Sequence, residues 1–303
     1  MTPMRQLCCL ILLLSGAVAS GLRADPVGTL DPAQVRVISQ TVGSDELLLA
    51  LADPSQIVAL SHLSRDARFS AVSAEAQSYP QLSANCDAET VLALKPTLIL
   101  CADYSRAELV SQVRKAGLHV IIFNRYNTLA DAYANLRLLA RELGPRSEAR
   151  AEQVIADCEA RVDALAKKLA PVRPVRVLAP SVYGLVPGDG TTFQDLCNHA
   201  GAENLASTLG GLHGHVPPPS ERMLAWPIEQ LVVAGESLDK ALAPFKATPP
   251  YHFMPAVREG RAVLVRSFIL SCLSHRRIDG YEELARALHP EVFAGEPVTA
   301  PQP

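Results

Sequence analysis

Residues 146–170 decide how the chain is organised, and they read RSEARAEQVIADCEARVDALAKKLA. The stretch contains no Gly or Pro and is rich in residues that favour helices. Its apolar residues recur at steps of three and four, which places them on one face of a helix. They are Val154, Cys158, Val162, Leu165 and Leu169. Gly144-Pro145 and Pro171 mark the two ends. A helix of about 37 Å, at 1.5 Å per residue, is as long as a small domain is wide.

Strand-like runs lie on both sides of this helix and alternate with helical segments. In the first half, strands are predicted at 35–39, 56–60, 97–101 and 118–123, with helices at 44–52, 87–94, 105–116 and 128–143. In the second half, strands are predicted at 175–179, 230–234 and 261–265, with helices at 192–200, 238–245 and 279–288. This alternation is typical of parallel sheets with right-handed crossovers.

The predicted fold class is therefore α/β: two Rossmann-like lobes with parallel sheets, joined by a single long α-helix. The predicted boundaries are 25–144 for the first lobe, 145–170 for the bridging helix and 171–295 for the second lobe. The Pro-rich residues 296–303 are expected to form a disordered tail. The alternative is that residues 146–170 form a surface helix of a single domain.

The first residues predict export. Met1–Gln6 carries one Arg, Leu7–Leu14 is apolar, and Ser15–Ser20 is made mostly of small residues. These are the three parts of a secretory signal peptide, 1–24, with cleavage expected after Ala19 or Ala24. The apolar run is too short to span a bilayer. Because Cys8 and Cys9 come too early for a lipid attachment site, no lipid anchor is expected.

Charge and cysteine content limit the kinds of partner and metal site that the sequence predicts. The formal net charge is −3, so no nucleic-acid partner is expected. Five cysteines remain after the predicted signal peptide, and an odd number leaves at least one of them free; they are Cys86, Cys101, Cys158, Cys197 and Cys272. No group of Cys and His residues has the spacing of a zinc site.

Ligands of open parallel sheets bind beyond the carboxyl ends of the strands. The residues at these ends offer aromatic rings, amides, hydroxyls and cations, and they are poor in paired carboxylates. The candidate ligand-binding residues are Gln40, His62, Tyr104, Arg125, Tyr126, Tyr183, Ser267, Phe268, Arg276 and Arg277.

Enzyme motifs are absent from the sequence. It has no G-x-S-x-G and no phosphate-binding P-loop. Gly188-Asp189-Gly190 is interpreted as a turn, and His213-Gly214-His215 as a solvated loop without nearby carboxylates. His62 follows a strand directly, so it either ligates iron or cobalt or faces solvent. No catalytic residue and no resident cofactor or metal is predicted.

Five segments, taken together, resemble a known family. They are residues 35–61 (VRVISQTVGSDELLLALADPSQIVALS), 87–101 (DAETVLALKPTLILC), 193–206 (FQDLCNHAGAENLA), 255–265 (PAVREGRAVLV) and 281–291 (YEELARALHPE). In this order they resemble the periplasmic substrate-binding proteins of ABC importers for iron complexes (siderophores or haem) and cobalamin, in which one rigid helix joins two lobes. Thr97 stands where that family usually has Asp.

The resemblance implies a periplasmic, monomeric carrier that binds a small metal complex between its lobes and delivers it to an ABC permease in the inner membrane. It implies that Glu75 and Glu221 dock onto the permease. Family members that hold corrinoid use several Trp and Tyr side chains, whereas this chain has a single Trp, Trp226. Haem binders use Tyr or His as the axial ligand, and siderophore binders use Arg and Tyr. Because the bridge is one helix, lobe closure is expected to be small.

Two alternatives stay open at this point. One is a two-lobed, metal-dependent or chelatase-like enzyme, in which His62, His213, His215 and Cys272 would have to converge on one metal. The other is a secreted adaptor of the same fold that docks a receptor. The sequence leaves the identity of the ligand undecided.

Overall fold

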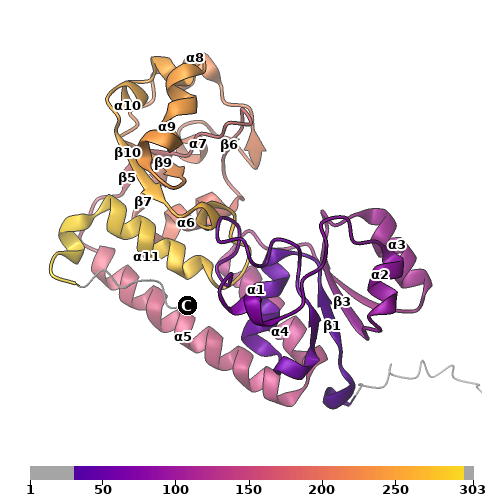
Figure 1. Cartoon of the computed structure of the whole chain (residues 1–303). Coiled ribbons are helices and arrows are strands. Elements are labelled where there is room, and N and C mark those ends of the chain that lie inside the picture. Colours follow the sequence, from indigo (N-terminus) through magenta and orange to yellow (C-terminus); the bar gives the residue numbers. More distant parts are fainter. Residues whose placement is uncertain (1–30, 297–303) are drawn as a thin grey trace, which may run out of the picture. The chain divides into compact units, whose positions relative to one another are not determined.

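The predicted long helix is present as α5, Pro145–Leu169. The computed structural model describes residues 31–296. Ala151 and Ile155 of α5 pack into the apolar core of the first sheet, and Cys158, Leu165 and Leu169 pack into the core of the second. One helix therefore belongs to both cores (Figure 1). Ile155 is a member of the apolar stripe that the sequence pattern missed.

The first sheet has the strand order β2-β1-β3-β4, with every neighbour parallel. Its strands are β1 (Val37–Ser39), β2 (Ile57–Ala59), β3 (Leu98–Ala102) and β4 (His119–Phe123). All five residues of β3 are buried, as its continuous apolar run predicts. We call this sheet and its helices α1 (Val42–Leu51), α2 (Ala88–Ala93), α3 (Ala107–Lys115) and α4 (Leu129–Leu143) the N-lobe.

The second sheet has the order β10-β9-β5-β7 and is also parallel throughout. Its strands are β5 (Val175–Leu178), β7 (Ala202–Asn204), β9 (Gln230–Ala234) and β10 (Ala262–Val265). We call this sheet and its helices the C-lobe. The helices are α6 (Thr192–His199), α7 (Leu205–Thr208), α8 (Ser220–Met223), α9 (Leu238–Ala247), α10 (Pro255–Arg258) and α11 (Arg277–Leu288). The predicted α/β class with two parallel sheets is confirmed.

Short 3₁₀ helices complete the described chain. They are η1 (Pro32–Gln34), η2 (Pro54–Gln56), η3 (Glu75–Ser78), η4 (Tyr251–Phe253), η5 (Ser267–Ser271) and η6 (Pro290–Phe293). Among these, η5 matters most for function, because it carries the chain from the end of β10 toward the first turn of α11.

His213-Gly214-His215, predicted to be a solvated loop, takes part in a small antiparallel sheet. Its strands β6 (Val186–Pro187) and β8 (His215–Val216) pair with each other, and His213 bridges to Asp189. The Nδ1 of His213 lies 3.3 Å from a carboxylate oxygen of Asp189. The expectation of a loop without nearby carboxylates is therefore wrong; backbone pairing brings Asp189 to His213 from a distant part of the sequence.

Helix α1 also begins differently from the prediction, which started it at Ser44. Thr41 is the N-cap, its hydroxyl accepts from the Ser44 N–H, and Ser44 reciprocates as the N3 residue of a capping box. The helix therefore starts two residues earlier, at Val42, and Asp45 and Glu46 lie in its buried first half.

The cysteines in residues 31–296 are all free and buried. They are Cys86, Cys101, Cys158, Cys197 and Cys272. Burial raises the pKa of the Cys101 and Cys158 thiols to about 11, and it also raises the pKa values of the other three.

The predicted signal peptide and residues 297–303 of the predicted tail lie outside the described residues. Glu296, which the prediction assigned to the tail, forms ion pairs with Lys168 at the end of α5 and with Arg286 of α11. Between residues 31 and 296, no helix combines the length and apolar character needed to cross a membrane.

Candidate functional site

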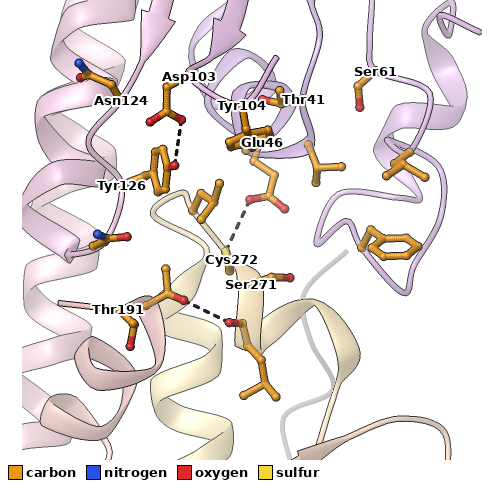
Figure 2. A pocket seen from close by; sticks show the side chains of 18 of the residues that line it. Thr41, Glu46, Ser61, Asp103, Tyr104, Asn124, Tyr126, Thr191, Ser271 and Cys272 are labelled. Carbon is orange, nitrogen blue, oxygen red and sulfur yellow. Dashed lines mark hydrogen bonds between the residues drawn. The ribbon is translucent and has the colours of Figure 1, made fainter. Parts of the chain in front are cut away.

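A cavity of about 720 Å³ lies beyond the carboxyl ends of the first sheet (Figure 2). Each of the four N-lobe strands contributes the residues that follow it; they are Gln40–Gly43 after β1, Ser61–Leu63 after β2, Asp103 and Tyr104 after β3, and Asn124, Tyr126 and Asn127 after β4. The C-lobe contributes three segments, Gly190–Thr192, Gly214–His215 and Leu270–Leu273. The volume is that of a small-molecule site.

The candidate residues Gln40, His62, Tyr104 and Tyr126 thus share one cavity. They lie close together because parallel strands end at the same edge of a sheet. The rings of Tyr104 and Tyr126 meet edge to face, with centroids 6.0 Å apart. Tyr104 is 57% exposed, which is unusual for so large an apolar surface and leaves its ring free to contact a ligand.

The hydroxyl of Tyr126 donates a hydrogen bond to Asp103 across 2.9 Å, as Figure 2 shows. Burial, followed by this bond and the charge of Asp103, raises the pKa of Tyr126 to about 12. Tyr126 therefore stays a neutral hydrogen-bond donor at physiological pH.

Two imidazoles also reach the cavity. His62 follows β2, and His215 lies on β8. Both side chains belong to exposed residues. No group of three or more His, Cys, Asp or Glu residues within 31–296 could hold a metal ion by itself. The convergence that a metal-dependent enzyme would require is therefore not found in the described chain.

The carboxyl group of Glu46 forms part of the cavity floor and reaches the C-lobe. It accepts hydrogen bonds from the Ser274 hydroxyl at 2.5 Å and from the Cys272 thiol at 3.6 Å (Figure 2), and from the Ala71 N–H at 3.0 Å. Burial raises its pKa. Beside it, a Cβ on Gly43 would lie 3.1 Å from Leu273, so glycine lets the C-lobe loop approach α1 closely.

Asp45, next to Glu46, is fully buried. Its carboxylate accepts from the N–H of Ser61 at 3.0 Å and from the Ser61 hydroxyl at 2.5 Å. Burial nevertheless raises the pKa of Asp45 to about 7, because the hydrogen bonds offset only part of the desolvation cost. The pair fixes Ser61, and so the start of the segment that carries His62.

Below the cavity, Arg277 ties the lobes together. Its guanidinium pairs with Asp195 at 2.9 Å and donates to the backbone carbonyls of Asn127, at 3.0 Å, and of Tyr126, at 2.5 Å. The Tyr281 hydroxyl also donates to Asp195. Arg277 and Asp195 are C-lobe residues, whereas Tyr126 and Asn127 belong to the N-lobe loop that lines the cavity.

The prediction that Arg277 faces the cleft is therefore wrong: it is 3% exposed, and its donors are used by protein acceptors. The prediction that Phe268 faces the cleft is also wrong. It lies in the C-lobe core at 4% exposure, with the Arg266 guanidinium 4.8 Å from its ring centroid. Both errors arise after β10, because the far end of η5, and not its start, reaches the cavity.

Four other candidates do not line the cavity either. Arg125 pairs with Asp131 at 3.1 Å and has a side chain that is 82% exposed. Tyr183 is 86% exposed in a turn closed by the Gly184 N–H and the Ser181 carbonyl. Ser267 and Arg276 are half-buried at the start of η5 and just before α11. Their roles as ligand contacts stay predictions.

Sequence reasoning missed a second set of lining residues: Glu46, Phe69, Thr191, Thr192 and His215. For Thr191 a signal existed, because a Thr before an apolar helical segment is typical of an N-cap, and its hydroxyl accepts from the Gln194 N–H. Because α6 starts at the cavity, its N-cap residue lines the cavity. Glu46 gave no such signal, since an acid in a first turn is common on exposed helices.

Comparison with known proteins agrees with this geometry. The family model described as "Periplasmic binding protein" matches residues 37–267, so the chain belongs to the periplasmic binding protein family. A curated relative, the uncharacterized ABC transporter substrate-binding lipoprotein YvrC of Bacillus subtilis, is 22% identical over 69% of this chain and 67% of its own length.

Solved structures with the same fold include the periplasmic heme-binding protein RhuT of Roseiflexus sp. RS-1, with a TM-score of 0.72, 21% identity and coverage of 86% of this chain and 99% of that one. A periplasmic heme-binding protein of Pseudomonas aeruginosa has a TM-score of 0.70, 25% identity and coverage of 88% and 95%. The vitamin B12-binding protein BtuF of Vibrio cholerae has a TM-score of 0.65, 17% identity and coverage of 84% and 96%.

Membership of this family makes the chain a substrate-binding protein of the ABC transporter type and not an enzyme. Such a protein works outside the cytoplasm, binds a small ligand and works with a permease. The predicted class is confirmed.

Removing the Arg277 cation should destabilise the folded state. We expect Arg277→Met to lower the free energy of unfolding by about 3–5 kcal/mol, because Asp195 then stays buried without its partner. Arg125→Met is the matched control: the Arg125 side chain is 82% exposed, and a pair screened by solvent in this way is worth about 0–1 kcal/mol. Urea denaturation measures both. Equal losses in the two variants would show that Arg277 is not a tie between the lobes.

The raised pKa of Asp45 predicts a pH dependence. The folded state holds the Asp45 proton up to about pH 7, whereas the unfolded chain releases it near its ordinary value of 3.8. The folded state therefore binds more protons between these values, and the contribution of Asp45 to stability falls as pH rises from about 4 to 7.

Asp45→Asn tests this dependence, because it keeps an acceptor for Ser61 and cannot ionise. We expect the stability of the wild type relative to the variant to fall across this pH range and to level off above it. Denaturation at a series of pH values gives the difference, and a flat difference would contradict the assignment.

Proposed function

We propose that this chain is the periplasmic substrate-binding protein of an ABC importer for a metal complex, and that haem is the cargo its cavity favours. The observation that carries the proposal is the chemistry of the cavity wall. It combines tyrosines, histidines and apolar side chains over about 720 Å³, and the described residues that line it include no Lys or Arg.

This wall suits a large, mostly apolar ring with a metal at its centre. Phenolate and imidazole are good ligands for iron, and Tyr104, with its 57% exposure, is the most accessible of the two tyrosines. An anionic ferric siderophore would meet Glu46 and Asp103 without a lining cation, which disfavours it. A corrinoid would find no Trp to contact in the cavity, because Trp226 packs against the C-lobe core.

The similar structures support the same choice. The Roseiflexus and Pseudomonas proteins are haem-binding proteins, and the Vibrio protein binds vitamin B12. Export by a signal peptide cleaved after Ala19 or Ala24 is part of this proposal.

Titration with ferric haem, followed by visible absorption, tests the cargo; cyanocobalamin and a ferric siderophore are titrated in parallel. We expect saturable binding of haem with a shifted absorption band. Tyr104→Phe should change that band and weaken binding by at least the roughly 10- to 100-fold seen for lost outer-shell partners, since it removes the proposed iron ligand itself.

Tyr126→Phe is the matched control, because the Tyr126 hydroxyl already donates to Asp103 and it should leave the band in place. A band that changes with Tyr126→Phe and not with Tyr104→Phe would reverse the two roles. Binding of cyanocobalamin or the siderophore alone would overturn haem as cargo.

Docking onto the permease through Glu75 and Glu221 also belongs to the proposal. Both residues are exposed, Glu75 at the start of η3 in the N-lobe and Glu221 in α8 of the C-lobe. We expect Glu75→Lys and Glu221→Lys to lower uptake by vesicles that contain the permease while cargo affinity is unchanged. Glu89→Lys, an exposed acid on α2, is the control. Full uptake with both reversed charges would rule these positions out.

A further inference from the structure

A second, smaller cavity of about 210 Å³ adjoins the large one. The two share a wall formed by Gln40, Thr41, His62 and Tyr104. The far side of the small cavity is formed by residues of the loop before α2 and by Ser105 and Arg106, which precede α3. We call it the side cavity. A ligand in the large cavity could extend a substituent into it only past Tyr104 and Gln40.

Gln40 lies between the two cavities, and its side-chain amide has a hydrogen-bond donor without a partner. Its backbone N–H donates to the Leu100 carbonyl at 3.0 Å, which fixes the residue at the end of β1. Its side-chain Nε2 is buried and finds no hydrogen-bond partner among residues 31–296. A buried donor without an acceptor costs free energy, and native structures rarely keep one without a reason. An acceptor oxygen on a ligand at this junction would remove the cost.

Arg106 supplies a cation to the same cavity. One terminal nitrogen of its guanidinium donates to the Cys86 carbonyl, which holds the group in place. Among the described residues, no ion pair joins Arg106 to a carboxylate; the exposed Arg106 also lines a neighbouring groove together with Asp87, Glu89 and Glu108. The remaining N–H groups of a guanidinium anchored in this way suit a planar carboxylate.

The large cavity has the opposite character. Its acidic wall residues are Glu46 and Asp103, and no Lys or Arg of the described residues lines it. A cargo that is apolar at its centre and acidic at its edge would therefore place its edge toward the side cavity and its ring against Tyr104.

We propose that the side cavity is a subsite for a carboxylate substituent of the cargo, held by the Gln40 amide and the Arg106 guanidinium. This inference rests on the proposed function, because haem carries propionate groups at one edge of its ring. It adds that the cargo is selected for a free acid at that edge, and that Arg106 determines this selection.

The test compares ferric haem with its dimethyl ester, which has the same ring and iron but no free carboxylate. Both are titrated into the full-length mature protein in the same mild detergent. We expect the wild type to bind haem about tenfold more tightly than the ester, the value of one charge-assisted hydrogen bond. Arg106→Gln should bring haem to the affinity of the ester and leave ester binding unchanged, and Gln40→Met should reduce the difference in affinity between the two compounds.

Arg114→Gln is the matched control, since Arg114 lies on α3, the helix that Arg106 precedes, and lines neither cavity. Equal affinity of the wild type for haem and ester overturns the subsite and leaves the proposed function standing. A preference for haem that persists in both variants also overturns the subsite, because the carboxylate of haem is then bound at another place. Absence of binding by both compounds removes the subsite together with the proposed cargo. The wild-type comparison decides the question even if a variant fails to fold.

Discussion

The buried guanidinium of Arg277, paired with Asp195 and bonded to the N-lobe carbonyls of Tyr126 and Asn127, holds the lobes together beside the cavity. A guanidinium at 3% exposure is tolerated only when its donors are satisfied. Here the acceptors come from both lobes: the carboxylate of Asp195 on α6, and the carbonyls of Tyr126 and Asn127 after β4. A large rotation of one lobe against the other would strain the bonds to Tyr126 and Asn127. The separation of the lobes at this point is thus set by the cost of leaving a buried cation unpaired.

Helix α5 extends the same constraint over a longer distance. It contributes side chains to both cores, so bending it would expose apolar surface in one of them. Glu46 adds a third tie, from α1 to Ser274 and Cys272. With the walls held at three places, the cavity is largely formed before a ligand arrives, and binding loses little conformational freedom. A carrier that must also release its cargo gains from this arrangement, since affinity does not depend on a large closure.

The sequence was sufficient for those features that depend on local pattern. The apolar stripe predicted α5, the alternation of strands and helices predicted two parallel sheets, and the shared edge of a parallel sheet predicted that Gln40, His62 and Tyr104 would meet. It failed where a side chain is directed by a distant partner. Arg277 is drawn inward by Asp195, 82 residues away, and Glu46 by Ser274, 228 residues away. His215 reached the cavity through the pairing of two-residue strands, which are too short to leave a periodic pattern.

The five buried thiols have a consequence for how this protein is made. A thiol must ionise before it attacks a disulfide or an oxidant, and burial holds these cysteines in the neutral form and away from reagents. Once folded, the chain is inert to the oxidising surroundings in which proteins of its class work. Within residues 31–296 the native state contains no disulfide, so folding of this part needs no thiol oxidase. These cysteines are open to mispairing only before folding, and their burial therefore protects the chain as well as contributing to packing.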